Sequence, residues 1–446
     1  MHQIQKHKHK HITSFQIIIL GFFSAIILGS LLLMLPFATQ DGSGAIFLDA
    51  LFTATSAVCV TGLIIQDTAT YWSSFGQSVI LVLIQIGGMG VVTVAVSLAA
   101  LSGRKIGLMQ RSTMQEAIAA HHVGGIVRMA KFILKMTIFI ELLGAAALSP
   151  VFCRDFGILK GLWYSIFHSI SAFCNAGFDL IGIREPFSSL TTYSSQPVVN
   201  LVIMLLIITG GIGFLTWEDI RNNRWHLNKY RMQSKVILSV TGLLIFLPAL
   251  YFFFCEFSDL SFGKRIWSSL FQSVTPRTAG FNTADLTKLS EVGQMLIITL
   301  MLIGGSPGST AGGMKTTTIA VLFSTALSVF RKNEHTHFFG RRIPEGTVRN
   351  AATIMMMYVF LFLTGGMIIS YIEEVPLVTA LFETASAIGT VGLSLGLTPE
   401  LGVVSHMILI GLMFFGRVGG LTLIFATLSE KHNGGAKYPQ EKITVG

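Results

Sequence analysis

Charged side chains are scarce in this sequence. Only 12% of its 446 residues are Asp, Glu, Lys or Arg, about half of the roughly 25% that is usual in soluble domains. The polar stretches between its apolar runs are short connectors, which leave no room for a soluble domain. The sequence also has only four cysteines, all in apolar surroundings, too few to indicate a disulfide framework. A soluble globular protein and a disulfide-stabilised secreted domain are therefore excluded.

Long apolar runs make up much of the sequence. A helix needs roughly 20 apolar residues to cross a bilayer, and runs of about that length recur along the chain. They lie at residues 15–38, 75–101, 129–152, 198–217, 236–257, 292–304, 316–330, 351–372 and 401–428. We predict an all-α polytopic membrane protein with eight spans. The first run is too long for a signal-peptide core, so we interpret it as a retained helix.

The basic residues indicate how the chain is oriented. The formal net charge is +9, and 21 of the 31 Lys and Arg residues lie in the two tails and in connectors 104–131, 221–235 and 331–349. The positive-inside rule places these segments and both termini in the cytoplasm. The opposite connectors hold 14 acids and 7 bases, a negative outer face that would concentrate cations. This distribution does not indicate nucleic-acid binding, and we predict a plasma-membrane protein.

A short motif recurs four times between the apolar runs. The stretches are FTATSAVCVTGL (52–63), FHSISAFCNAGF (167–178), LFQSVTPRTAGF (270–281) and FETASAIGTVGL (382–393). In each, an apolar residue (Leu270 in the third) is followed ten positions later by glycine. Internal repeats of this kind define the architecture. They predict repeats 15–127, 128–234, 235–347 and 348–428, between tails 1–14 and 429–446.

Each motif ends a segment too short to cross the membrane. The segments 46–58, 161–173, 264–275 and 375–388 are predicted to be helices that enter from the outer side and return as loops. Irregular backbone at membrane depth needs protein or water around it. Four such loops around one axis would line a pore and point backbone carbonyls at a weakly hydrated cation such as K+. The predicted filter residues are Val60, Thr61, Gly62, Asn175, Ala176, Gly177, Thr278, Ala279, Gly280, Thr390, Val391 and Gly392.

Residues 291–330 are too long for one span and too rich in glycine at their centre for one helix. Glycine and proline destabilise a helix interior, so we predict an intramembrane loop (304–314) that acts as a gate beneath the filter. A plain hinge is the alternative. The predicted gate residues are Gly304, Gly305, Ser306, Pro307, Gly308, Ser309, Thr310, Ala311, Gly312, Gly313, Lys315 and Arg417. The last two are intramembrane cations that would repel a permeating ion; snorkelling to the inner surface is their alternative.

Three further charged sites have structural interpretations. Lys135 and Glu141 are predicted to form a pair or an inner-surface anchor. Glu383 is expected to brace the fourth loop. Arg277, a cation beside a cation filter, is expected to bridge to an outer acid.

The motifs SAVCVTG, SAFCNAGF, TPRTAGFNTAD and SAIGTVGLSLG resemble the filter segments of the Trk/Ktr/HKT superfamily of potassium transporters. With eight spans and a short N-terminal tail, the chain resembles the bacterial Ktr membrane subunit over its whole length. The resemblance implies four M1–P–M2 units around one pore, an intramembrane gate, and a potassium-preferring filter with glycine at Gly62. It also implies a homodimer on a cytosolic nucleotide-binding ring, and Na+ as a further activating or coupling ion. The basic connectors could equally bind membrane lipids.

Two other functions remain open on sequence alone. A sodium- or proton-coupled symporter with alternating access would use the same fold. The stretch Gly304-Gly305-Ser306-Pro307-Gly308 also matches the G-x-S-x-G nucleophile pattern, which suggests an intramembrane serine hydrolase. That enzyme would need a base, and the candidates His168 and His406 are predicted to lie on the outer side.

Overall fold

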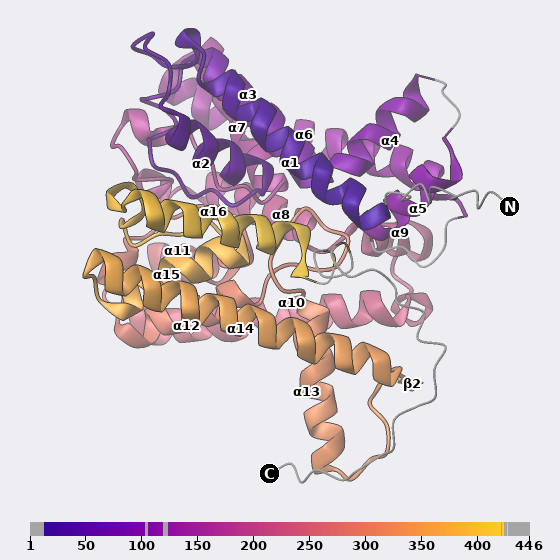
Figure 1. The fold of residues 1–446 in the computed structure, drawn as a ribbon. Coiled ribbons are helices and arrows are strands. Elements are labelled where there is room, and N and C mark those ends of the chain that lie inside the picture. The colour runs from indigo at the N-terminus through magenta and orange to yellow at the C-terminus, as the bar shows by residue number, and fades with distance from the viewer. Residues whose placement is uncertain (1–12, 103–105, 119–123, 421, 423–425, 427–446) are drawn as a thin grey trace, which may run out of the picture.

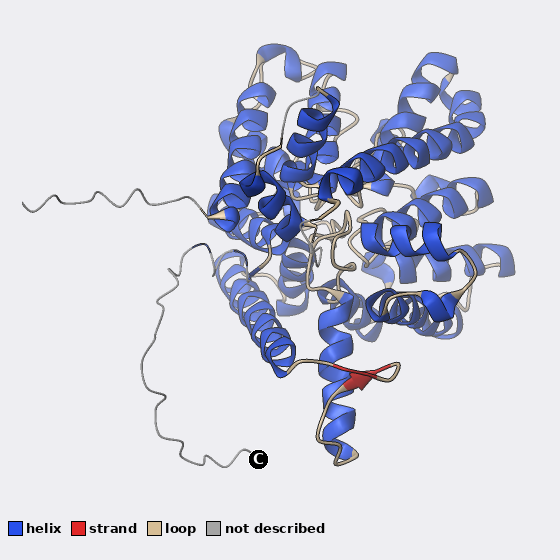
Figure 2. Ribbon diagram, turned by 90° about the vertical axis from the view of Figure 1, so that its right-hand side faces the viewer, coloured by secondary structure: helices blue, strands red, loops and turns tan. Residues whose placement is uncertain are grey.

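The computed structural model describes residues 13–102, 106–118, 124–420, 422 and 426 (Figure 1). Most of the two predicted cytoplasmic tails, 1–14 and 429–446, lies outside the described residues. The described chain is almost entirely helical, with one two-stranded hairpin. Helices surround the centre of the molecule, where the loops gather (Figure 2).

One order of helices occurs four times: a long helix, a short helix, and a further helix after the loop. The first repeat has α1 (Ser14–Leu33), α2 (Phe47–Val58), α3 (Ser74–Met89), α4 (Val91–Leu101) and α5 (Leu108–Ala117). The second has α6 (Ile126–Phe156), α7 (Ile158–Phe173), α8 (Pro197–Gly211) and α9 (Phe214–Asn223). The third has α10 (Met232–Tyr251), α11 (Phe262–Val274), α12 (Glu291–Leu302) and α13 (Thr316–Phe330). The fourth has α14 (Glu345–Glu373), α15 (Leu377–Gly389) and α16 (Val403–Val418). The boundaries predicted between repeats remain a prediction.

Short elements connect the helices. Strands β1 (His337–Phe338) and β2 (Arg341–Arg342) pair antiparallel between α13 and α14. In both views α13 and this hairpin extend away from the rest of the molecule (Figures 1 and 2). The single turns are η1 (Pro36–Ala38), η2 (Ile181–Ile183), η3 (Thr191–Tyr193), η4 (Leu227–Lys229), the π-turn η5 (Phe252–Glu256), η6 (Leu286–Lys288) and η7 (Thr398–Glu400).

The first helix of every repeat is long and apolar enough to span a membrane. These are α1, α6, α10 with its π-turn, and α14, and two bent pairs of helices also qualify if each is counted as one span. The four predicted short helices form as α2, α7, α11 and α15, with ends within three residues of the expected positions. The chain is thus a multi-pass helical membrane protein.

Two of the predicted continuous spans are wrong. The run 75–101 bends by 91° between α3 and α4, and the run 198–217 bends by 98° between α8 and α9. The bends fall at Gly90 (φ 83°, ψ 130°) and Gly213 (φ 92°, ψ 145°), and α16 ends in the same way before Gly419 (φ 88°, ψ 134°). Only glycine adopts this backbone conformation without strain. A hydropathy pattern does not detect it.

Gly90→Ala tests this account of the bends. Nothing nearer than Thr93 Oγ1, at 3.8 Å, faces a Cβ added at Gly90, so backbone strain is the main cost. We expect a loss of about 1–3 kcal/mol of stability, measured by thermal unfolding in detergent. Gly242→Ala is the control, because Gly242 lies inside α10 with open space around it. Equal melting temperatures for the two variants would contradict the assignment of strain to the bend.

Candidate functional site

The four predicted filter loops share one backbone conformation. The residue two positions before each glycine has positive φ although it is not glycine: Val60 (49°), Asn175 (59°), Thr278 (61°) and Thr390 (50°). The glycines themselves also have positive φ: Gly62 (91°), Gly177 (73°), Gly280 (77°) and Gly392 (93°). Left-handed backbone at a non-glycine residue costs about 1–2 kcal/mol. Its fourfold recurrence with three different kinds of side chain shows that the surroundings impose one geometry.

These loops meet in a closed ring. A Cβ on Gly62 would lie 2.5 Å from the carbonyl oxygen of Ala176, and one on Gly177 would lie 2.8 Å from that of Ala279. A Cβ on Gly280 would lie 2.5 Å from the carbonyl oxygen of Val391, and one on Gly392 would clash with that of Thr61. Each loop therefore touches the next, and the fourth touches the first. All four glycines line one cavity of about 300 Å³, called the outer cavity because it lies on the side predicted to face outward.

The short helices before the loops, α2, α7, α11 and α15, are called the pore helices, and they hold the loop amides away from the axis. Thr61, Ala176 and Val391 donate their backbone N–H to Ser56, Ser171 and Ser386 carbonyls at 2.8 Å. In the third loop Ala279 donates to the Thr275 carbonyl at 3.0 Å. Within the described residues, the carbonyl oxygens of Thr61, Ala176, Ala279 and Val391 accept no hydrogen bond. Carbonyls in this state are suited to replace the hydration shell of a cation.

The third loop is one residue shorter than the others, which corrects the predicted alignment. Its amide bond spans four residues, where the other three span five. The apolar anchor of the pore helix is therefore Phe271 and not Leu270. Phe271 is fully buried, as are its counterparts Phe52, Phe167 and Phe382, and each wedges a pore helix into the core.

Side chains next to these anchors brace the outer ends of the loops. Glu383 Oε1 accepts from Ser394 Oγ at 2.7 Å and from Leu395 N at 3.1 Å, as the predicted bracing role requires. His168 Nε2 accepts from Leu180 N at 3.3 Å. Gln272 Nε2 donates to Asn282 Oδ1 at 3.0 Å. In three of the four repeats, a side chain of the pore helix thus fixes the following loop by a hydrogen bond.

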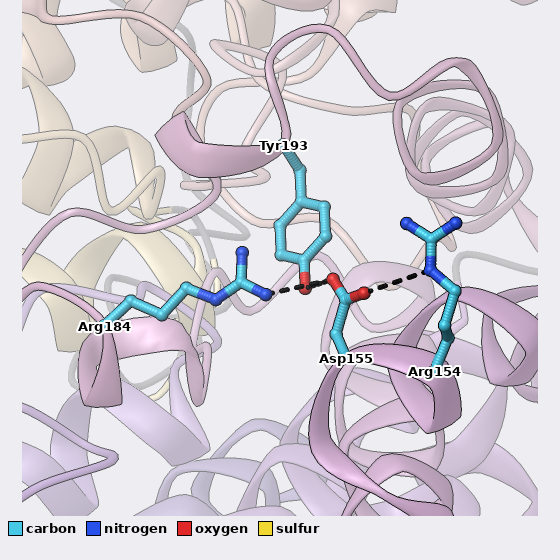
Figure 3. A network of polar contacts seen from close by, with 4 residues as sticks. All are labelled: Arg154, Asp155, Arg184 and Tyr193. Carbon is cyan, nitrogen blue, oxygen red and sulfur yellow. Dashed lines mark hydrogen bonds and ion pairs between the residues drawn. The ribbon is translucent and has the colours of Figure 1, made fainter.

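A polar network holds the segment that follows the second loop. Asp155, at the end of α6, accepts hydrogen bonds from Tyr193 (2.8 Å) and Arg184 (3.0 Å), and Arg154 approaches from the other side (3.4 Å). Figure 3 shows these side chains converging on the one carboxylate. Arg184 also stacks on the rings of Phe156 and Tyr193. The network fixes the segment that carries Arg184 and Tyr193 to the end of α6.

Residues 304–313 form a loop between α12 and α13, as predicted. Its ends are joined by a parallel bridge between Ile303 and Met314. Toward the second repeat, Ser306 N donates to Gly211 O at 3.0 Å and Gly308 O accepts from Phe214 N at 2.7 Å. Toward the fourth repeat, Gly313 N donates to Gly416 O at 3.1 Å. The loop also reaches the filter, because a Cβ on Gly312 would clash with Thr390.

Both intramembrane cations bind carbonyls of this loop. Lys315 Nζ donates to Ala311 O at 2.9 Å and Gly312 O at 3.1 Å. Arg417 donates to Thr310 O, to Gly87 O and, at 3.1 Å, to Gly88 O. Arg417 thereby ties the loop to α3 of the first repeat. Both side chains are directed at the loop.

The loop borders an inner cavity of about 360 Å³. Its lining includes Pro307, Lys315, Arg417 and the bend residues Gly90 and Gly419. The outer and inner cavities share no lining residue, and the filter and the loop lie between them.

Neither predicted ion pair forms among the described residues, while the alternative role of Lys135 as an inner-surface anchor stays a prediction. Arg277 makes no ion pair among the described residues, and its buried Nε and Nη1 have no hydrogen-bond partner. Asp67, one of the predicted outer acids, accepts hydrogen bonds from the amides of Ala69, Thr70 and Phe187 instead. Glu141 is buried and bonded to Gln85 (3.3 Å). Lys135 is exposed instead.

The residues of the hydrolase interpretation lie in separate networks. Ser306 Oγ pairs with Thr316 Oγ1 at 3.3 Å. The ring of His168 contacts Tyr164 O (2.7 Å) and Leu180 N, and that of His406 contacts Thr398 O (2.8 Å). No hydrogen bond joins Ser306 to a histidine within the described residues.

Comparison with known proteins identifies the family. A family model described as cation transport protein, TrkH, matches residues 2–434. The chain is 40% identical over 454 residues to the potassium/sodium uptake protein NtpJ of Enterococcus hirae, covering 99% of both chains. It is 39% identical to the Ktr system potassium uptake protein B of Bacillus subtilis, covering 97% of this chain and 96% of that one.

A solved structure agrees at the level of the fold. The potassium transporter TrkH of Vibrio parahaemolyticus superimposes with a TM-score of 0.74 at 20% identity, covering 96% of this chain and 87% of that one. The resemblance drawn from the filter motifs is confirmed. The chain belongs to the TrkH family of cation transport proteins, and its Ktr and NtpJ relatives are homologous to it over nearly their full length.

Proposed function

We propose that this protein takes up potassium through a filter made by the four loops. The observation that carries the proposal is the closed ring of loops, each of which leaves buried carbonyl oxygens without donors. Such a ring matches a large, weakly hydrated monovalent cation, because it offers several neutral oxygens in place of water. The names of the Ktr and NtpJ relatives, potassium uptake and potassium/sodium uptake, support K+ as the transported ion and Na+ as a second ion.

Residues 304–313 are proposed as the gate of this path. The loop lies between the two cavities and contacts the second and fourth repeats. Lys315 and Arg417 place positive charge directly beneath the filter, where it would repel a cation as long as the loop is in place. Moving the loop would remove the obstruction. It would also break the hydrogen bonds from Lys315 and Arg417 to the loop carbonyls, which hold their positive charge beneath the filter.

We also propose a regulatory partner and a dimer. Work is needed to move a loop that is bonded to the second and fourth repeats and, through Arg417, tied to the first, and the described residues contain no nucleotide-binding fold. A cytosolic nucleotide-binding ring docked on the basic inner connectors would supply that work, and a homodimer would present two such surfaces. The name of the Bacillus subtilis relative, a Ktr system protein, supports a system of several components. Membrane lipids would cover the remaining inner surface.

Gly62→Ser tests the filter. The new Cβ would lie 2.5 Å from the Ala176 carbonyl oxygen in a backbone conformation with φ 91°, so the ring must shift. We expect the K+:Na+ uptake ratio to fall about ten-fold or more, which corresponds to about 1.4 kcal/mol of relative ion binding. The measurement is uptake in potassium-uptake-deficient cells. Gly411→Ser, in open space within α16, is the control, and an unchanged ratio in Gly62→Ser would contradict the filter.

Deletion of residues 306–311 tests the gate. It removes the contacts of the loop with Gly210 and Gly211 and the Thr310 carbonyl that binds Arg417. We expect K+ flux into proteoliposomes to rise several-fold without a regulatory subunit. A folded, monodisperse deletion variant with unchanged flux would refute the gate.

The outer cavity should make uptake depend on external pH. Asp179 lines this cavity; burial raises the pKa of Asp179 to about 7, and the charge of Asp67 acts in the same direction. The carboxylate is ionised above that pH and attracts cations, and it becomes neutral below it. We expect the half-saturating K+ concentration to rise as external pH falls from about 8 to about 6.

Asp179→Asn should show the higher half-saturating concentration at both pH values. Asp285→Asn is the matched control, since Asp285 is outer, pairs with Lys288 and does not line this cavity. An unaltered pH dependence in Asp179→Asn would show that another group is responsible.

A further inference from the structure

Asn175 connects the filter to the intramembrane loop. It is the one amide among four equivalent positions, which the other loops fill with Val60, Thr278 and Thr390. The side chain is fully buried. Its Nδ2 donates to Arg277 O in the third filter loop (3.3 Å) and to Ile207 O in α8 (3.4 Å). Its Oδ1 accepts from Thr310 Oγ1 at 2.9 Å.

Thr310 is the partner on the intramembrane loop. Its hydroxyl lies 3.0 Å from Phe173 O and 2.9 Å from Asn175 Oδ1, so one hydrogen serves two acceptors at the end of the second pore helix. Its backbone N–H donates to Gly210 O, and its carbonyl accepts from Arg417. Every polar group of Thr310 is therefore engaged while the loop is in place.

The junction depends on a glycine in α8. A Cβ on Gly210 would lie 2.6 Å from Asn175 Oδ1 and 2.7 Å from Thr310 Oγ1. Gly210 also lies against the Phe173 carbonyl, as the corresponding Gly87 and Gly416 lie against the Val58 and Ile388 carbonyls. Gly416 additionally faces the Thr390 methyl group, but the first and fourth repeats have no amide at this filter position. Among the described residues, a side-chain hydrogen bond between the loop and one of these four filter positions is thus a feature of the second repeat, although the loop also packs against Thr390 of the fourth.

We propose that Asn175 is a positioning residue through which the place of the intramembrane loop sets the geometry of the filter. With Thr310 donating to Oδ1, the amide is oriented so that Nδ2 holds the Arg277 carbonyl and keeps the second and third loops together. When the loop leaves, Oδ1 loses its donor, the amide is free to rotate, and the third loop is released. Ion preference then differs between the closed and open gate. This inference rests on the proposed filter and gate.

The test compares variants of the full-length protein in proteoliposomes, with K+ and Na+ fluxes measured separately. Thr310→Val removes the hydroxyl at nearly constant shape. We expect total flux to rise and the K+:Na+ ratio to fall, each by about three- to ten-fold, the scale of one hydrogen bond. Thr310→Ser keeps the hydroxyl and should restore both values to within about two-fold of the unaltered protein.

Asn175→Thr provides the second arm. Threonine occupies this position with the same positive φ in the third and fourth loops, so the variant is compatible with the fold. We expect it to lower the K+:Na+ ratio as Thr310→Val does, and the double variant to match either single variant because both break one junction.

Two results would overturn the inference. A rise in flux at an unchanged K+:Na+ ratio in Thr310→Val would show that Thr310 only anchors the loop. Additive effects of Asn175→Thr and Thr310→Val would show that the residues act independently. Absence of K+ flux through both the unaltered protein and the 306–311 deletion would contradict the proposed function itself, and the inference with it.

Discussion

Around the axis of this molecule, carbonyl oxygens from four loops are buried beside one another while the matching N–H groups are bonded to the pore helices. A buried backbone group without a partner costs as much as a lost hydrogen bond. That cost has to be met by the rest of the fold and by the ion. The buried phenylalanines, the Ser and Thr bonds at the helix ends, and the Glu383, His168 and Gln272 braces all oppose relaxation of the loops.

The four repeats agree in backbone and differ in side chain. One backbone conformation is adopted by three kinds of side chain, at Val60, at Asn175 and at the threonines Thr278 and Thr390. The helices that follow the filter loops show the same combination. In the first, second and fourth repeats this helix is interrupted at a glycine, whereas in the third repeat it is interrupted by residues 304–313. Because all four quarters belong to one chain, each can specialise. The third carries the loop, the second carries the amide that contacts it, and the fourth supplies Arg417.

Much of this architecture could be predicted from the sequence because the repeated glycines mark the loops directly. The positions of α2, α7, α11 and α15 and of the intramembrane loop followed from that pattern. The bends at Gly90 and Gly213 were missed because the runs around them stay apolar, and hydropathy carries no information on φ. The sequence did contain a signal for these bends, in GGMG (87–90) and GGIG (210–213). Their similarity to the glycines of the third repeat indicates a break in each helix that follows a filter loop.

Contacts between residues that are far apart in the sequence could not be predicted from it. Asn175 and Thr310 are 135 positions apart, and their meeting depends on the space left by Gly210. The one-residue shortening of the third loop, which makes Phe271 the anchor, shows only in its hydrogen bonds. For Arg277 the general rule that a buried cation is paired gave the wrong expectation.

The central claim is that a dehydrated alkali cation sits on the axis among these carbonyls. The most direct measurement is an experimental structure of the protein with Rb+ in place of K+, using anomalous scattering to locate the ion. The account predicts a peak on the axis between the carbonyl oxygens of Thr61, Ala176, Ala279 and Val391. Well-ordered loops with no peak among them, or Rb+ found only elsewhere in the bundle, would contradict it.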